Sequence, residues 1–139
     1  MINIANRTVS NYAPFRTYKR YRHQDYVERA LIGHLKNGNI DDLENEVRVY
    51  IPTSFNKKQV FLDFVIEKNG KIGIIEVDGN QHYEFTPKFH KNYSDFVKQQ
   101  NRDRIVDKYA KTQGKILHIS TALMREEVDK KLDQFIKSI

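Results

Sequence analysis

The sequence predicts an α/β fold: one domain in which helices flank a four-stranded mixed sheet, in the order α-β-β-β-α-β-α. Its 139 residues are the length of one ordinary domain and can bury a sizeable core. Two apolar, β-branched runs are separated by Lys68-Asn69-Gly70, and Asn-Gly is the strongest short hairpin signal. A helical segment and a short fourth strand follow, so the last strand is expected to pair in parallel with the strand before the helix.

The chain begins its regular structure with a helix and a strand. Residues 24–36 keep one face roughly apolar, which predicts a helix that stops at Asn37-Gly38. Residues 46–51 alternate apolar and polar side chains, which predicts a strand that ends at Pro52.

The hairpin comes next. Residues 60–67 and 71–78 are its two strands, joined by the Asn-Gly turn. Residues 79–92 are expected to form a loop that is rich in aromatic and His residues.

The last third of the chain predicts a helix, a strand and a second helix. Residues 93–112 contain no Gly or Pro and favour a long helix. Residues 115–120 form a short strand, in which His118 is expected to be a core residue. A charged helix over 122–137 is expected to be capped by Ser120 or Thr121.

The composition excludes several classes of protein. With no Cys, the chain has neither a disulfide framework nor a thiolate-ligated zinc site. No apolar stretch approaches the roughly 18 residues of a membrane span. The first twenty residues are polar and basic, so no secretory signal is expected. These features predict a soluble, cytoplasmic protein without a membrane partner.

Positive charge is concentrated at the start of the chain. The net charge is +6, with a pI of about 9.4, and residues 1–29 account for most of it. Basic and aromatic side chains alternate there, a composition suited to phosphate and base contacts. We therefore expect residues 1–22 to form a nucleic-acid-binding arm and residues 23–139 to form the folded domain. The alternative is a poorly ordered basic tail that aids solubility. The arm's candidate contact residues are Arg16, Tyr18, Lys19, Arg20, Tyr21 and Arg22.

Two carboxylates are predicted to face each other across the hairpin. Asp63 and Glu76 lie at equal distances from the centre of the Asn69-Gly70 turn, so they occupy opposite positions on one face. Such a pair repels unless a positive group lies between them, and a divalent cation held by oxygen ligands is the natural candidate. Asp78 shares the face of Glu76 and is a third candidate ligand. The alternative is a pair of strand acids that each form their own salt bridge.

A histidine and three helical acids complete the candidate set. His82 follows Glu76 by six residues and is a candidate general base; taken alone, it would be a loop residue stacked among aromatic rings. Glu28 lies on the first helix, and Asp103 and Asp107 share a face of the long helix. These three acids are equally well explained as members of surface ion pairs.

The runs Phe61-Leu62-Asp63-Phe64-Val65-Ile66 and Ile75-Glu76-Val77-Asp78-Gly79-Asn80-Gln81-His82 resemble the PD-(D/E)XK superfamily of nucleases. The resemblance is to the branch of very-short-patch-repair mismatch endonucleases and phage homing-type endonucleases, which has an E-D-x-H-D pattern. It covers about residues 24–120 and is most specific over 61–82.

The resemblance implies a restriction-endonuclease-like domain with assigned roles. Asp63 is the central metal-ligating acid, Glu76 the second-strand acid and His82 the catalytic histidine, with Gln81 orienting. Glu28 is the first-helix acid and Asp103 the acid on the following helix. One departure is clear: Asp78 stands where the superfamily has a Lys that helps to activate the attacking water.

The sequence thus predicts an endonuclease that cleaves DNA with Mg²⁺ or Mn²⁺ and nicks one strand per active site, encoded by a phage or mobile element. The alternative is a non-catalytic DNA-binding module that keeps the nuclease fold, which Asp78 in place of Lys would favour. An RNase or junction-specific nuclease and a purely protein-binding role are weaker alternatives. Cutting both strands would need a homodimer or a second event, and a targeting partner protein would extend a short recognition site.

Overall fold

The computed structural model describes residues 2–7, 22–52, 57–79 and 91–139. It is an α/β fold with a four-stranded mixed sheet and three helices, as predicted. The elements are α1 (Arg22–Lys36), β1 (Asp42–Pro52), β2 (Lys57–Lys68), β3 (Lys71–Asp78), α2 (Tyr93–Gln113), β4 (Lys115–Ser120) and α3 (Arg125–Ser138).

The strands lie in chain order, β1-β2-β3-β4. The first three are antiparallel, and β4 runs parallel to β3 after the crossover through α2. The two-residue turn between β2 and β3 is confirmed: Lys68 pairs with Lys71. Asn69 and Gly70 have φ values of 52° and 76°, the left-handed conformation that this tight hairpin turn requires.

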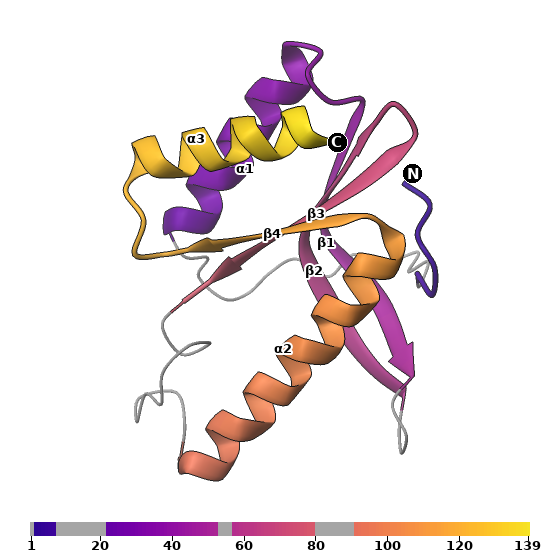
Figure 1. Cartoon of the computed structure of the whole chain (residues 1–139), viewed down its shortest axis with the longest axis vertical. Helices are drawn as coiled ribbons and strands as arrows, with labels where there is room; N and C mark the ends of the chain where they lie inside the picture. Colours follow the sequence, from indigo (N-terminus) through magenta and orange to yellow (C-terminus); the bar gives the residue numbers. More distant parts are fainter. Residues whose placement is uncertain (1, 8–21, 53–56, 80–90) are drawn as a thin grey trace.

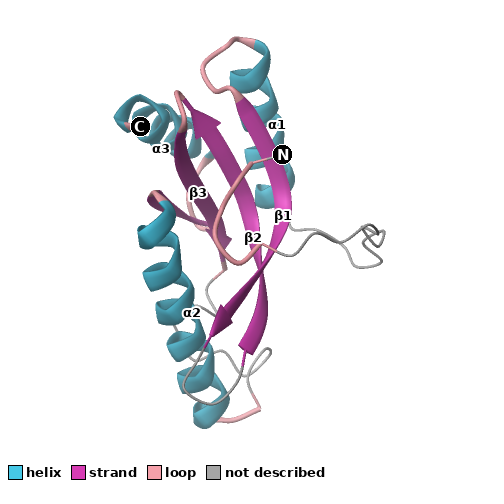
Figure 2. Cartoon of the chain, turned by 90° about the vertical axis from the view of Figure 1, so that its right-hand side faces the viewer, coloured by secondary structure: helices cyan, strands magenta, loops and turns pink. Residues whose placement is uncertain are grey.

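Each face of the sheet carries its own core. Helices α1 and α3 cover one face (Figures 1 and 2), where Phe64, Ile75 and Ile119 are fully buried. Helix α2 lies on the other face, where Val65 and Ile74 pack with residues of that helix. β3 is buried on both faces, which accounts for its nearly continuous run of apolar residues.

The β1–β2 ladder is interrupted at one position. Asn45 pairs with Phe64 and Val47 pairs with Leu62, but the residues between them do not pair. Leu62 belongs to the α2-side core whereas Phe64 belongs to the other core, although residues two apart in a regular strand share a face. Glu46 has a φ of 52°, which is rare for a residue with a side chain. One residue lies between the paired positions on each strand, Glu46 on β1 and Asp63 on β2, so the register is kept although the local pairing is lost.

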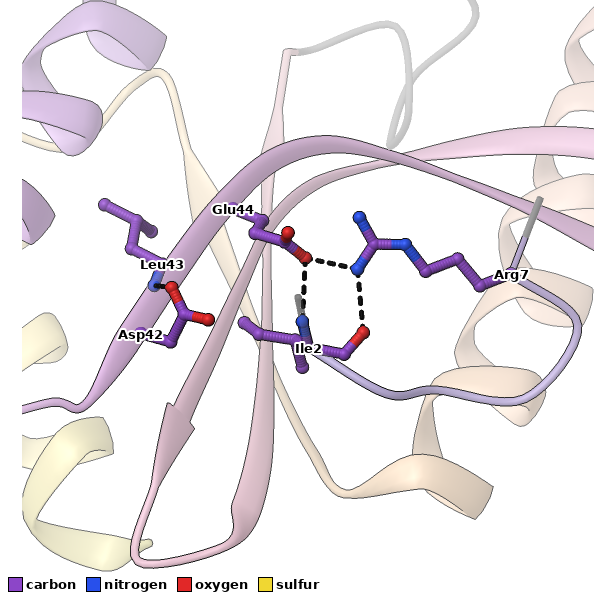
Figure 3. A network of polar contacts seen from close by, with 5 residues as sticks. All are labelled: Ile2, Arg7, Asp42, Leu43 and Glu44. Carbon is purple, nitrogen blue, oxygen red and sulfur yellow. Dashed lines mark hydrogen bonds and ion pairs between the residues drawn. The ribbon is translucent and has the colours of Figure 1, made fainter. Parts of the chain in front are cut away.

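The first residues of the chain pack against the body of the protein (Figure 3). Ile2 is 1% exposed, and its amide donates to Glu44 Oε2 at 3.3 Å. Arg7 pairs with Glu44 and donates to the Ile2 carbonyl at 2.7 Å. Asn6 accepts a hydrogen bond from the Tyr50 amide at 3.0 Å. Residues 2–7 therefore pack against the edge of β1. The boundary at residue 22 between the arm and the folded domain stays a prediction.

The expected cap of the last helix is wrong. Helix α3 begins at Arg125, and its N-cap residue, Met124, makes no side-chain capping bond. Ser120 instead shapes the turn between β4 and α3, because its Oγ accepts from the Ala122 amide at 3.1 Å. In the part of the chain that is described, no helix is long and apolar enough to cross a membrane.

Candidate functional site

Asp63 and Glu76 meet where β2 and β3 diverge. The β2–β3 ladder runs to Phe64 opposite Ile75, so these two acids occupy the next position in the same register. Asp63 Oδ2 accepts a hydrogen bond from the Val77 amide at 2.9 Å. The Asp63 side chain also raises the pKa of Glu76, through its charge and through hydrogen bonding. The two carboxylates therefore lie side by side, as the hairpin geometry predicted.

The carboxylate of Glu76 is enclosed by protein. Burial raises its pKa well above 4.5, and the charges of Asp63 and Asp78 raise it further. Its Oε1 atom is inaccessible to solvent and has no hydrogen-bond partner among the described residues. A contact between two carboxylates needs either a shared proton or a cation, because two adjacent negative charges repel. The lone pairs of the unpartnered Oε1 are available to a cation.

His118, Asp78 and Asp107 form a series of ion pairs beside Asp63 and Glu76. His118 Nδ1 lies 2.6 Å from Asp78 Oδ2, and His118 Nε2 lies 2.6 Å from Asp107 Oδ1. The hydrogen bond to Asp78 is the main cause that raises the pKa of His118 to about 9, with Asp107 adding to it against the opposing effect of burial. Both ring nitrogens face acceptors, so the imidazole is a protonated cation that links β3, β4 and α2.

His118 places a positive charge next to the acidic pair. It is the register partner of Glu76 in the parallel β3–β4 ladder. Asp78 is 7% exposed and directs a carboxylate oxygen at this imidazolium. The charge of Asp78 is thereby compensated without a metal ion, which leaves Asp63 and Glu76 as the two better-suited ligands.

The two helical acids lie elsewhere around the site. Glu28 accepts a hydrogen bond from Asn45 Nδ2 at 3.3 Å, beside the interrupted position of the β1–β2 ladder. Asp103 is half-buried on α2, one turn before Asp107. Among the described carboxylates, those that act on the pKa of Glu76 are Asp63 and Asp78.

Several predicted site residues lie outside the described residues. They include His82 and Gln81 and five of the six arm residues; the sixth, Arg22, begins α1, and its side chain is also not described. The five are Arg16, Tyr18, Lys19, Arg20 and Tyr21.

The residues present fit a magnesium-type cation better than a zinc-type one. Within the described ranges, no three His, Asp or Glu side chains are grouped as a metal-binding set. Mg²⁺ commonly uses only one or two protein carboxylates and completes its shell with water and substrate phosphates. Asp63 and Glu76 supply two hard oxygen donors, one of them with a buried and unpartnered atom.

The central position of His118 differs from the prediction. A core histidine was expected in this strand, whereas the His118 side chain is 34% exposed and joins two carboxylates. One signal was available in the sequence. Side chains alternate between the two faces of a strand, so one face of residues 115–120 must lie under the helix that carries Asp107.

Comparison with known proteins supports the fold alone. No protein-family model and no curated protein matches this chain. The protein VC1899 from Vibrio cholerae superposes with a TM-score of 0.53 at 13% identity, over 83% of this chain and 32% of that one. Can2 from Sulfobacillus thermosulfidooxidans, in complex with cyclic tetra-adenylate, superposes with a TM-score of 0.52 at 16% identity, over 83% of this chain and 36% of that one. The chain therefore spans about a third of each of these proteins and has the same fold as part of each.

Proposed function

We propose that this protein is a metal-dependent endonuclease that hydrolyses phosphodiester bonds in DNA. The observation that carries the proposal is the contact between the Asp63 and Glu76 carboxylates, with the buried Glu76 Oε1 left unpartnered. A protein rarely keeps such an arrangement for stability, because each buried and unpaired polar group costs about 1–3 kcal/mol. Strongly perturbed carboxylates of this kind are characteristic of functional sites.

Asp63 and Glu76 would hold the cation. When bound, a divalent cation lowers the pKa of a coordinated water and neutralises charge that develops on the phosphate. Asp63 is oriented for this role by the amide of Val77, which fixes one of its oxygens at 2.9 Å. Glu76 would release its proton, or the proton that it shares with Asp63, to solvent on binding a cation.

The protonated ring of His118 has a supporting role. It forms ion pairs with Asp78 and Asp107, which offset part of the negative charge around the acidic pair. His118 hydrogen-bonds through both ring nitrogens and acts here as a positioning residue.

The remaining roles rest on the family resemblance. His82 would accept the proton of the attacking water, with Gln81 orienting it. Glu28 and Asp103 would complete the surroundings of the site. The basic and aromatic residues of the arm would hold the DNA backbone and stack on bases, and their positive charge is consistent with this role.

Two findings support a nucleic-acid partner in general terms. The chain has a net charge of +6. One of the proteins that shares the fold, Can2, was determined with cyclic tetra-adenylate, which is a nucleotide ligand.

A non-catalytic DNA-binding module is the second candidate. Asp78 stands where the resemblance implies a Lys, and its Oδ2 lies 2.6 Å from His118 Nδ1. In that case the acidic pair would keep its proton and bind no cation.

Cleavage of supercoiled plasmid tests the proposal. The full chain is incubated with plasmid in Mg²⁺, in Mn²⁺ and in EDTA, beside Asp63→Asn and the matched control Glu67→Gln, which changes another acid of β2. We expect metal-dependent nicking by the unmodified chain and by Glu67→Gln, and none by Asp63→Asn. A clear gel shift without cleavage in either metal would contradict the proposal and favour the binding module.

A further inference from the structure

The C-terminal half of β1 and the N-terminal half of β2 form a two-stranded ribbon beyond the acidic pair. The β1–β2 ladder continues there from Val47 opposite Leu62 to Pro52 opposite Lys57. The β2–β3 ladder has already ended at Phe64. Val49 and Leu62, on the inner side of the ribbon, are fully buried in the core beside α2. Figure 2 shows this part of the sheet twisting towards α2.

The opposite side of the ribbon carries four polar and aromatic residues. Arg48 pairs with Phe61 in the ladder, and Tyr50 pairs with Gln59. We call these four residues the outer ribbon face. Phe61 is 51% exposed and Tyr50 is 39% exposed, which makes them the exposed large aromatic residues of the described sheet.

The side chains of the outer ribbon face are ordered by one another. The Arg48 guanidinium lies 5.1 Å from the centroid of the Phe61 ring, within the range of a cation–π contact. With its amide oxygen towards the guanidinium, Gln59 accepts a hydrogen bond from Arg48 Nη1 at 3.3 Å. The Phe61 ring is thus held in place and remains half exposed, which is the state that a stacking platform requires.

We infer that the outer ribbon face binds an unpaired base of a nucleic-acid strand, which stacks on Phe61 while Arg48 attracts the phosphate backbone. Exposed aromatic rings with neighbouring positive charge are the usual elements of single-strand binding, because every base has a π-face. Phe61 precedes Asp63 by two residues on the same strand, a separation of about 7 Å. The inference deepens the proposed function, on which it rests for the class of substrate: it names a strand with an unpaired base.

A second copy of the chain is a poorer occupant of this face. A two-fold contact centred here would bring two Arg48 guanidinium groups together, and their like charges repel. A polyanion with flat bases complements both the charge and the ring.

The test uses the absence of Trp from the chain. Phe61→Trp introduces a single tryptophan on the outer ribbon face of the full-length protein, and its fluorescence can be excited selectively over that of the eight Tyr. In EDTA, so that no cleavage occurs, we expect saturating single-stranded DNA to quench this fluorescence, and heparin, a polyanion without bases, to leave it nearly unchanged. Equal effects of the two polyanions, or no effect of DNA, would overturn the inference.

Binding measurements on substituted chains separate stacking from charge. By fluorescence anisotropy of a labelled oligonucleotide in EDTA, Phe61→Ala and Phe61→Leu should both weaken single-strand binding about tenfold, because each lacks the aromatic ring. The matched control Tyr93→Ala removes a more exposed ring on α2 and should bind as the unmodified chain does. Arg48→Gln should reduce the slope of log affinity against log salt by about 0.7.

Other results would refute the inference. Full retention of affinity by Phe61→Leu would show that the ring does not stack. Concentration-dependent dimerisation that Phe61→Ala abolishes, with DNA affinity unchanged, would assign the face to a second copy. Because these assays contain no metal ion, they can succeed when the cleavage test fails, and the reverse also holds.

Discussion

The imidazolium of His118 should make the stability of the protein depend on pH between neutrality and mild alkali. The perturbation is His118→Gln, which keeps a polar side chain under α2 but cannot carry charge. In the unmodified protein the pKa of His118 is raised from 6.5 to about 9 by Asp78 and Asp107. Because the folded-state pKa is the higher one, the stabilisation is complete below about pH 6.5 and is lost as the pH rises through about 9.

The size of the effect follows from the two pKa values. A tenfold change in a protonation equilibrium is worth about 1.4 kcal/mol, so the unscreened linkage between pH 6 and pH 9.5 amounts to about 3 kcal/mol. The His118 side chain is 34% exposed, and solvent screens part of the interaction. We therefore expect about 1.5 kcal/mol after this reduction.

Urea denaturation at pH 6 and pH 9.5 measures the effect. The free energy of unfolding of the unmodified chain should fall by about 1.5 kcal/mol more than that of His118→Gln over this interval. Groups that titrate in both proteins cancel in this comparison. Asp107→Asn, which removes one of the two acceptors, should give an intermediate dependence. If the unmodified chain and His118→Gln lose stability in parallel, the ion-pair chain at this site is refuted.

Three further predictions concern the site and the backbone. Glu76→Gln should leave the stability in EDTA unchanged or increased, because Gln can donate the hydrogen that the acidic pair otherwise shares. In the unmodified chain, Mn²⁺ at a hundredfold excess over Kd should raise the melting temperature, through a stabilisation of about 2.7 kcal/mol. Glu76→Gln should lose this rise, and a retained rise would argue against Glu76 as a ligand. Gly114→Ala should lower the free energy of unfolding by at least about 1–3 kcal/mol, because its Cβ would lie 2.0 Å from the Ile72 carbonyl oxygen. The control Gly33→Ala, on α1 with open space around it, should be stabilising by about 0.5–1 kcal/mol, and equal effects at the two glycines would contradict this assignment. Glu46→Gly should raise the melting temperature because Glu46 has a φ of 52°; a large decrease would show that its side-chain contacts outweigh the strain.

The hairpin was predictable because its determinants are local. Asn69 and Gly70 fix the turn, the turn fixes the register, and the register brings Asp63 and Glu76 together. The faces of β3 also follow directly from alternation. The part of the site that depends on these two strands could therefore be predicted from the sequence.

The parts that were missed depend on contacts between distant segments. His118 acquires its role only when α2 docks on the sheet and places Asp107 within 2.6 Å of it. The strand β1 begins at Asp42, four residues earlier than the alternation indicated, because β2 provides a pairing partner for residues with weak strand preference. Ile2 is buried through its contact with the edge of β1, which its own polar surroundings in the sequence do not indicate.

Calorimetric titration of the full-length chain with Mn²⁺ tests the central claim most directly, since it does not depend on knowing the DNA target. We expect one cation to bind per chain with release of a proton, because burial and the neighbouring acids raise the pKa of Glu76 and the form that ligates a cation is the carboxylate. Repeating the titration in two buffers with different ionisation enthalpies measures that proton. Asp63→Asn should not bind, and Glu67→Gln should bind as the unmodified chain does. Absence of binding by the unmodified chain, or equal binding by Asp63→Asn, would contradict the assignment of Asp63 and Glu76 as the cation site.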